Sequence, residues 1–423
     1  MITRRILRQL TPKVAVRFSS SLTLPDVDLE YYCNSENLNE INHNIALRKG
    51  VGDINRVLEV YNVFKATSPN ETTYQNVQSK LYHELCILPN RTHPAVKDYG
   101  EEPRLVTEIN QNRDFGTHKP LEFSEITRRL NLLRTDKLGH TCGPKSYFFL
   151  GELAELEEAL IKYTVKVLLK NDFQLISVPD ILPSKILQNC GMMLHGERTQ
   201  VYTLDPHHHG PDLCLSGTAE MSLAGLLADS VIPQNKLPLK LAAVSRCYRA
   251  ETSNVIEERG IYRVHQFTKV EMFVVSTPEE SDQTLEYIRN LQQDLFAPLG
   301  IHMRVLDMPP YELGAPAYRK YDIEAWMPGR NNYGEISSCS NCTDYQSRRL
   351  HIKYQNGNTQ KYVHTLNGTA CAIPRMLIAL LETHQDPKGK ILLPEVLQPF
   401  MSGKQFIKKN TAVPDVKIAK TKK

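Results

Sequence analysis

The segment RGIYRVHQFTKVEMF, from Arg259 to Phe273, constrains the fold more strongly than any other part of the sequence. Side chains of a β-strand alternate between two faces, and one face of this segment is mostly apolar, from Tyr262 to Met272. The other face carries Arg263, His265, Phe267, Lys269 and Glu271. The segment predicts a long strand with a core side and a side that suits an elongated ligand with an anionic part, a flat ring and an ammonium group. A solvated face with chance charges would give the same alternation.

The surrounding sequence predicts an α+β domain built on an antiparallel sheet. Strand-like alternation dominates from Leu239 to Val275, and strands outnumber the helices that could serve as crossovers. The final helix, PRMLIALLETHQ, has Pro374 in its first turn. An earlier helix has apolar residues at intervals of three and four, at Leu153, Leu156, Leu160, Tyr163 and Val167. The strand FQLISVPDIL follows, and its Pro179 must lie at a sheet edge, a strand end or an interface.

Residues 1–20 are typical of a mitochondrial transit peptide, which predicts a location in the mitochondrial matrix. They contain five basic residues, and no acidic residue occurs before Asp26. Apolar residues recur at four-residue steps from Ile2 to Val14, so a helix here would be amphipathic with an arginine-rich flank. A basic arm that contacts RNA is the alternative.

Three further regions follow the leader. Residues 21–104 have a polar helical pattern with two or three short helices from Asp28 to about Leu88, followed by the proline-containing linker ILPNRTHPAV. Residues 105–403 form the main domain. Residues 404–423 carry seven lysines and one aspartate, which predicts a disordered tail.

Composition limits the class of protein. No apolar run approaches the length of a membrane span, so no membrane association is expected. The nine cysteines are an odd number and are scattered, which indicates reduced thiols and not a disulfide framework. Neither G-x-G-x-x-G nor a Walker loop occurs, so any ATP must be held in another way.

Four segments join the predicted strand as candidates for chemistry: SGTAE, CYRAE, GEISSCSNC and LNGTACAIPR. Each one alone could supply a structural ion pair or a helix cap. Within SGTAE and CYRAE the polar residues are two positions apart, so each pair shares a face if it lies on a strand. Their candidate residues are Thr218, Glu220, Arg249, Glu251, Glu335, Ser338, Asn367, Thr369 and Arg375.

Together, these segments resemble the class II aminoacyl-tRNA synthetases, and specifically the seryl-tRNA synthetases of the mitochondrial type. The resemblance covers Leu105–Leu397 and, more loosely, Leu29–Val96. Its most specific parts are motif 2, Arg246–Phe273, and motif 3, Leu366–Glu382. The resemblance implies a class II antiparallel sheet, a helical arm that binds tRNA(Ser), the substrates serine and ATP, and Mg²⁺. It also implies a dimer built partly around Pro179, either with itself or with a related subunit.

The resemblance also implies roles for the candidate residues at the ATP site. Arg249 would hold the α-phosphate, Arg375 the γ-phosphate and Arg263 the phosphate tail, and these three arginines are the expected catalytic residues. Phe267 would stack on adenine, and Glu251 would accept a hydrogen bond from its amino group.

The metal and the amino acid complete the implied site. Glu335 and Ser338 would supply oxygen ligands to Mg²⁺, but their spacing requires a twist or bulge if both reach one ion. Glu271 and Thr218 would bind the serine ammonium, and Thr369 would bind its hydroxyl. The full set expected to bind serine is Thr218, Glu220, Arg249, Glu271, Asn367 and Thr369.

The chain departs from the family pattern in two places. The space for the long coiled-coil arm of bacterial members is too short, by roughly half or more, and sustained heptads are missing. The motif 2 loop reads ETSNVIEERG and is one residue shorter than is typical. Both changes concern contacts with tRNA, so tRNA selection is expected to differ while catalysis is not.

Other readings remain at this stage. A paralogue could keep the fold as a binding or subunit-stabilising protein, although such proteins usually lose the motif arginines or the pocket glutamates. A sister ligase for threonine or proline would usually carry an anticodon-binding domain, and the sequence continues for few residues beyond Arg375. A zinc site at the C-x-x-C pair Cys339 and Cys342, or a metal at His207–His209, is a weaker alternative.

Overall fold

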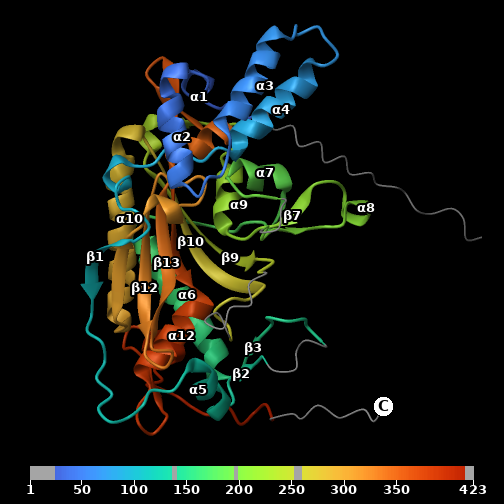
Figure 1. Ribbon diagram of the computed structural model, residues 1–423. Coiled ribbons are helices and arrows are strands. Elements are labelled where there is room, and N and C mark those ends of the chain that lie inside the picture. The colour runs from blue at the N-terminus through green and yellow to red at the C-terminus, as the bar shows by residue number, and fades with distance from the viewer. Residues whose placement is uncertain (1–23, 136–140, 195–198, 252–259, 415–423) are drawn as a thin grey trace, which may run out of the picture.

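Figure 1 shows the computed structural model of the chain, which describes residues 24–135, 141–194, 199–251 and 260–414. The predicted leader, the centre of the motif 2 loop at 252–259 and the last part of the lysine-rich tail lie outside the described residues.

An eight-stranded sheet forms the frame of the main domain, and every neighbouring pair is antiparallel except the last, β9 with β4. In spatial order the strands are β1 (Arg104–Ile109), β11 (Met303–Asp307), β12 (Arg319–Met327), β13 (Asn332–Asn341), β16 (His364–Ala372), β10 (Gln266–Ser276), β9 (Leu239–Tyr248) and β4 (Gln174–Ile176). The sequence-based prediction of an α+β fold on an antiparallel sheet is therefore confirmed.

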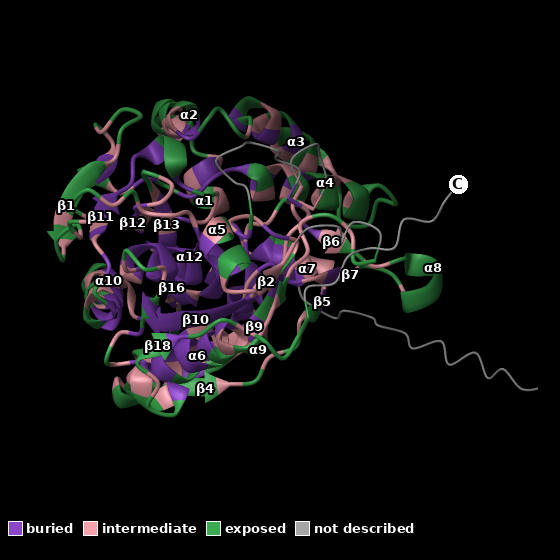
Figure 2. Ribbon diagram, turned by 90° about the horizontal axis from the view of Figure 1, so that it is seen from below, coloured by how far each residue is buried: buried purple, intermediate pink, exposed green. Residues whose placement is uncertain are grey.

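Three helices cover one face of this sheet and bury the main core. They are α6 (Glu152–Lys170), α10 (Ser281–Phe296) and α12 (Ile373–His384). Val270, Met272 and Val274 of β10 point into this core, which is the purple centre of Figure 2. The helix predicted from apolar spacing is present as α6, and the predicted final helix is present as α12 with Pro374 in its first turn.

Smaller elements cover part of the opposite face. Helices α7 (Ser184–Asn189), α9 (Ala219–Leu226) and α11 (Tyr345–Leu350) build a second core with two three-stranded sheets. These sheets are β5 (Ile181–Pro183), β7 (Leu213–Leu215) and β6 (Tyr202–Thr203), and β15 (Thr359–Tyr362), β14 (Lys353–Asn356) and β8 (Val231–Pro233). The predicted strand FQLISVPDIL is instead two short strands, β4 and β5, and Pro179 lies in the connection between them, outside both. Its lack of an N–H donor is therefore no obstacle to either ladder.

Short elements complete the main domain. Near α12 lie α5 (Phe123–Arg129) and the pairs β2 (Leu133–Arg134) with β3 (Phe148–Phe149) and β17 (Ile391–Leu392) with β18 (Phe406–Ile407). Helix α8 (Pro206–His209) projects from the body (Figure 1).

The N-terminal region forms its own helical cluster at one end of the molecule (Figure 1). It contains α1 (Leu29–Tyr32), α2 (Leu38–Leu47), α3 (Ile54–Ala66) and α4 (Tyr74–Ile87). The prediction of two or three helices missed the single-turn helix α1, which is too short to show a period. Helices α3 and α4 form a hairpin of 13 and 14 residues, about 20 Å long at 1.5 Å per residue. This length agrees with the short arm expected from the sequence.

Two boundary predictions are wrong. The tail was predicted to be disordered from residue 404, but β18 (Phe406–Ile407) pairs with β17, so the main domain continues into the lysine-rich segment.

The second wrong boundary is the start of the strand that carries the candidate residues. Strand β10 begins at Gln266, so Arg263 and His265 precede it. The neighbouring strand β9 ends at Tyr248, which pairs with Gln266, and the chain before this point turns at Gly260 with a positive φ of 75°. Without a partner strand, the alternation from Arg259 to His265 does not extend the ladder.

Candidate active site

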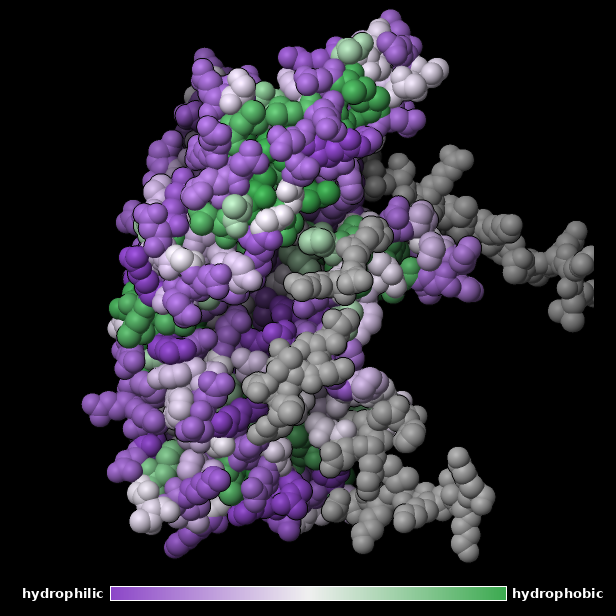
Figure 3. Space-filling model, in the orientation of Figure 1, coloured by the Kyte–Doolittle hydropathy of each residue, from purple (hydrophilic) through white to green (hydrophobic). Residues whose placement is uncertain are grey.

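A cavity of about 330 Å³ opens on the sheet face opposite α6, α10 and α12, and Figure 3 shows the hollow with its hydrophilic floor. The structure brings all of the predicted site residues to its wall. These are Thr218, Glu220, Arg249, Glu251, Arg263, Phe267, Glu271, Glu335, Ser338, Asn367, Thr369 and Arg375.

Strand β10 supplies the centre of the wall by simple alternation. Phe267, Lys269 and Glu271 line the cavity, while Val270 and Met272 between and beyond them enter the core. The faces assigned from the sequence are therefore right over the true strand.

The residues before the strand reach the site differently. Arg263 lies in the preceding turn, and its Nη1 donates to Oε2 of the buried Glu251 at 3.3 Å. His265 was predicted on the same face but does not line the cavity. Its Nδ1 lies 2.8 Å from the Tyr202 hydroxyl and 3.0 Å from the carbonyl oxygen of Arg249, so it ties the turn to the end of β9.

Thr218 and Glu220 reach the cavity from the start of a helix and not from a strand. Thr218 is the N-cap of α9, and its hydroxyl accepts from the backbone N–H of Glu220 at 3.3 Å. Glu220 is buried, and its Oε1 accepts from Nε2 of Gln346 at 2.6 Å. Burial, and next the Glu271 carboxylate, raise the pKa of Glu220.

Lys269 is a site residue for which the sequence suggested no role. Its Nζ donates to Oγ1 of Thr218 at 2.9 Å and forms an ion pair with Glu271. Oε2 of Glu271 also accepts from the Thr369 hydroxyl at 3.3 Å. The lysine ammonium thus contacts the same oxygens that were predicted to bind a substrate ammonium. Its place on the polar face of the strand was the available signal.

A β-bulge places both predicted metal ligands in the cavity. Glu324 of β12 pairs with Glu335, and Ile323 pairs with Ser337, so Ile336 is the extra residue. In a regular strand Glu335 and Ser338 would face opposite sides of the sheet. The extra residue lets both face the cavity, as the sequence required.

The electrostatics at Glu335 suit a hard cation. Burial would raise the pKa of Glu335, but the positive charges of Lys320, Arg375 and Arg249 lower it below its usual range. An ionised carboxylate and the Ser338 hydroxyl, which lines the same cavity, are oxygen donors of the kind that fits Mg²⁺, with phosphate and water as further ligands.

The arginines gather around Glu335 and Phe267. Arg375 lies in the first turn of α12, and its Nη1 donates to Oε2 of Glu335 at 3.3 Å. Its guanidinium lies 4.5 Å from the ring centroid of Tyr262, an aromatic contact that the sequence did not indicate. Arg249 follows β9 and lies 5.3 Å from the centroid of Phe267.

The cavity therefore has a cationic end, where Glu251 and Glu335 pair with arginines beside an aromatic ring, and a carboxylate end. At the carboxylate end, Glu220 and Glu271 lie with hydroxyl groups and with Lys269.

The other metal candidates have less support from the geometry. Cys339 and Cys342 are buried, and burial raises the pKa of both thiols. Within the described ranges, no group of three or more histidine, cysteine, aspartate or glutamate side chains could hold a metal. His207–His209 form the exposed helix α8. No helix among the described residues is long and apolar enough to cross a membrane.

Known proteins resemble this chain in sequence and in fold. Residues 202–384 match the family model described as the tRNA synthetase class II core domain (G, H, P, S and T). The chain is 39% identical to the serine–tRNA ligase of Rubrobacter xylanophilus over 358 residues, which cover 83% of each chain. The chain belongs to the seryl-tRNA synthetase family.

Two further seryl-tRNA synthetase comparisons agree. The mitochondrial serine–tRNA ligase of Mus musculus is 43% identical over 349 residues, which cover 82% of this chain and 66% of the mouse protein. The chain thus spans about two thirds of that relative's length. The crystal structure of seryl-tRNA synthetase from Pyrococcus horikoshii complexed with ATP aligns with a TM-score of 0.81 at 26% identity. That alignment covers 91% of this chain and 100% of the other. The family resemblance and the class II fold are confirmed.

Proposed function

We propose that the chain is a serine–tRNA ligase, which activates serine with ATP to seryl-adenylate and transfers the seryl group to the 3′-terminal adenosine of tRNA(Ser). The observation that carries this proposal is the division of the cavity into two parts. Three arginines, an aromatic ring and the two carboxylates that pair with arginines form one part, and Glu220 and Glu271 with hydroxyls and Lys269 form the other. An amino acid and a nucleotide triphosphate, laid end to end, match these two parts.

In the first step, a serine carboxylate oxygen attacks the α-phosphorus, and the bond from that phosphorus to the leaving pyrophosphate oxygen breaks. Arg249 neutralises the charge that develops on the α-phosphate, while Arg263 and Arg375 hold the leaving pyrophosphate. Phe267 stacks on adenine, and Glu251 accepts from the adenine amino group. No covalent intermediate with the protein is needed, since positioning and charge neutralisation lower the barrier.

The carboxylate end selects the amino acid. Glu271 and Thr218 receive the serine ammonium next to Lys269, with Glu220 and Asn367 beside them. Thr369 binds the serine hydroxyl. An alanine in this site would leave a buried polar group unpaired, at a cost of about 1–3 kcal/mol, so alanine is rejected.

Glu335 and Ser338 would hold Mg²⁺. The bound ion supplies positive charge that neutralises the phosphate oxygens. The protein's contribution is the bulged strand β13, which carries both residues to the wall of the cavity.

Partners and location follow from the same proposal. Residues 21–104 form the tRNA-binding arm, and the catalytic domain follows, reaching past the predicted boundary at 403 to include β18. The remaining residues to 423 form a basic tail. The chain forms a dimer around Pro179, with itself or with a related subunit, and residues 1–20 direct it to the mitochondrial matrix. The mouse relative's mitochondrial name supports this location.

The short hairpin points to a distinct mode of tRNA selection. Between residues 54 and 87 it carries three basic side chains and three acidic ones, so it offers phosphates no net positive charge. Recognition then depends on the tRNA body and acceptor stem, without a long variable arm. Charging two serine tRNAs that differ only in variable-arm length tests this, and strict dependence on a long arm would refute it.

The competing function is a paralogue that binds but does not catalyse. The presence of the three arginines and of both pocket glutamates in one cavity favours the enzyme. ATP–pyrophosphate exchange with each of the common amino acids, in the presence of Mg²⁺, decides between them. We expect exchange with serine and not with threonine or alanine, and a chain without serine-dependent exchange would be the paralogue.

A further inference from the structure

The N-terminal helical region is joined to the wall of the active-site cavity by a buried arginine. Arg48 directly follows α2, and only 4% of its surface is exposed. Its Nη2 donates to the carbonyl oxygen of Gly314 at 2.5 Å and to that of Ala315 at 3.4 Å. Its Nη1 donates to the carbonyl oxygen of Asn90 at 3.2 Å. Gly314, Ala315 and Pro316 all line the cavity.

The linker after α4 makes a second connection to the same loop. The backbone N–H of Asn90 donates to the carbonyl oxygen of Ala315 at 2.8 Å, and its Nδ2 donates to that of Pro316 at 2.8 Å. Asn44 of α2 donates to the carbonyl oxygen of Asn90 at 3.0 Å. Helix, linker and loop thus form one hydrogen-bonded unit around the Arg48 guanidinium.

Arg48 holds the helix and the loop together through hydrogen bonds to carbonyl oxygens and not through an ion pair. The acceptors named above are main-chain carbonyls, which carry no net charge. Burial lowers the pKa of Arg48 to about 10, which shows how poorly solvated the guanidinium is. A buried cation of this kind is retained only where several well-directed hydrogen bonds offset its desolvation.

The clamped loop lies at the amino-acid end of the cavity. A Cβ on Gly191 would lie 2.9 Å from Cδ of Pro316, so the loop packs directly on Gly191. The preceding carbonyl, that of Cys190, accepts from Nε2 of Gln346, which also donates to Glu220. The loop therefore packs against Gly191, and the neighbouring Cys190 is joined through Gln346 to Glu220, a carboxylate predicted to help bind serine.

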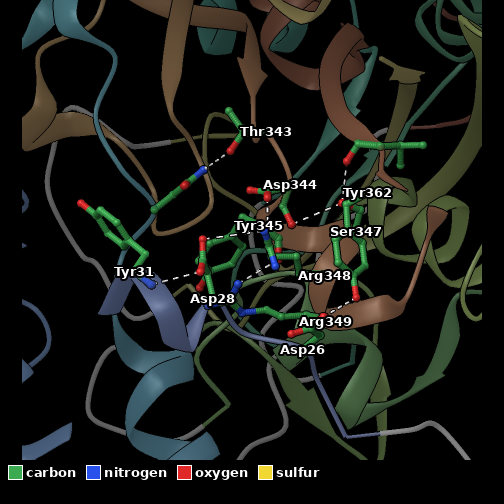
Figure 4. A network of polar contacts seen from close by, with 12 residues as sticks. Asp26, Asp28, Tyr31, Thr343, Asp344, Tyr345, Ser347, Arg348, Arg349 and Tyr362 are labelled. Atoms are coloured by element: carbon green, nitrogen blue, oxygen red, sulfur yellow. Dashed lines mark hydrogen bonds and ion pairs between the residues drawn. The ribbon is translucent and has the colours of Figure 1, made fainter. Parts of the chain in front are cut away.

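A second set of contacts joins the N-terminal region to helix α11 near the amino-acid end of the cavity (Figure 4). Asp28, the N-cap of α1, lies 3.7 Å from Arg348 of α11, and Arg348 Nε donates to Asp344 at 2.6 Å. Gln346, which binds Glu220, belongs to the same helix.

We propose that the N-terminal helical region is part of the amino-acid activation site, with Arg48 as the positioning residue that holds the Gly314–Pro316 loop against the serine end of the cavity. The region therefore serves serine activation even when no tRNA is present. This inference rests on the proposed function, because its activity readout is serine activation.

The test uses the full chain with Arg48→Met, which keeps the apolar length and removes every donor. Lys49→Met is the matched control, because Lys49 is the next residue, is exposed, and lies 3.6 Å from Glu312. Serine-dependent ATP–pyrophosphate exchange without tRNA gives the KM for serine and the KM for ATP. Hydrogen–deuterium exchange across residues 313–318 reports the loop independently of activity.

We expect Arg48→Met to raise the KM for serine about tenfold and to speed amide exchange in the loop, with the KM for ATP changed less than about twofold. Lys49→Met should match the wild type in both measurements. Arg48→Lys, which keeps the charge but not the forked donors, should fall between them and replaces Arg48→Met if that variant does not fold.

Three results would overturn the inference: an unchanged serine KM in a folded variant, equal rises in both KM values, or the same effect from Lys49→Met. If the wild type shows serine-dependent ATP–pyrophosphate exchange in those cases, the proposed function still holds. A wild-type chain without serine-dependent exchange would overturn both.

Discussion

The buried pair of Lys269 and Glu271 gives the sharpest energetic test of the site. Their side chains are 8% and 4% exposed, so neither charge is solvated by bulk water. Lys269→Met removes the ammonium and keeps a chain of similar length. Removing one partner of a buried pair typically costs about 3–5 kcal/mol, because the other charge stays buried without compensation. The Thr369 hydroxyl, 3.3 Å from Glu271, remains as a donor, so we expect about 3 kcal/mol.

Two further variants separate the pair from its surroundings. Glu271→Gln removes the carboxylate, and the double variant removes both charges. Because the double variant leaves no uncompensated charge, its loss should be smaller than the sum of the two single losses by about 2–3 kcal/mol.

The measurement is the free energy of unfolding of the four proteins by urea, followed by circular dichroism at one neutral pH. Losses that add within about 0.5 kcal/mol would show that the two charges are not coupled. The ion pair would then not be what holds Glu271 in the cavity.

Three other predictions concern catalysis, pH and packing. Arg249→Ala should lower kcat of adenylation by about 10²–10³-fold with little change in melting temperature, and equal losses in activity and stability would make Arg249 a structural residue instead. Burial and Glu271 raise the pKa of Glu220, so the folded protein binds the Glu220 proton more tightly than the unfolded chain does. The stability that this proton contributes is therefore lost as the pH rises above the usual glutamate pKa, about 4.3, towards the raised pKa. Glu220→Gln should therefore flatten the fall in melting temperature as the pH rises above about 4, seen by calorimetry, whereas parallel curves would contradict the shift. Gly329→Ala should destabilise the fold by at least about 3 kcal/mol in urea unfolding, because a Cβ there would lie 2.2 Å from the backbone oxygen of Leu121, and a loss below about 1 kcal/mol would refute this.

The sequence predicted what depends on local periodicity. Alternation placed Phe267 and Glu271 on the cavity side of β10, and helical spacing located α6 and α12. Parity alone required the irregularity that appears as the bulge at Ile336. These features follow from backbone geometry, which a single segment encodes.

Features that depend on distant partners were beyond such reasoning. The start of β10 is set by where β9 ends, so the alternation before Gln266 was misleading. Thr218 and Glu220 share a wall through a helix cap, although their spacing fits a strand equally well. The hydrogen bond from Arg48 to Gly314 joins residues 266 positions apart, and the local sequence of neither segment predicts this contact.

The α3–α4 hairpin has a fixed base and an unrestrained tip. At its base, the clamp around Arg48 and Asn90 couples the hairpin to the cavity wall. At its tip, residues 68–73 are all exposed, and Glu71 and Ser68 bond to each other. Insertions are tolerated best at such exposed tips. Insertions or deletions near the tip can therefore change the length of the arm without disturbing catalysis. Chimaeras that exchange arms should be joined within the hairpin, between Ile54 and Ile87, so that the contacts of Arg48 and Asn90 stay intact.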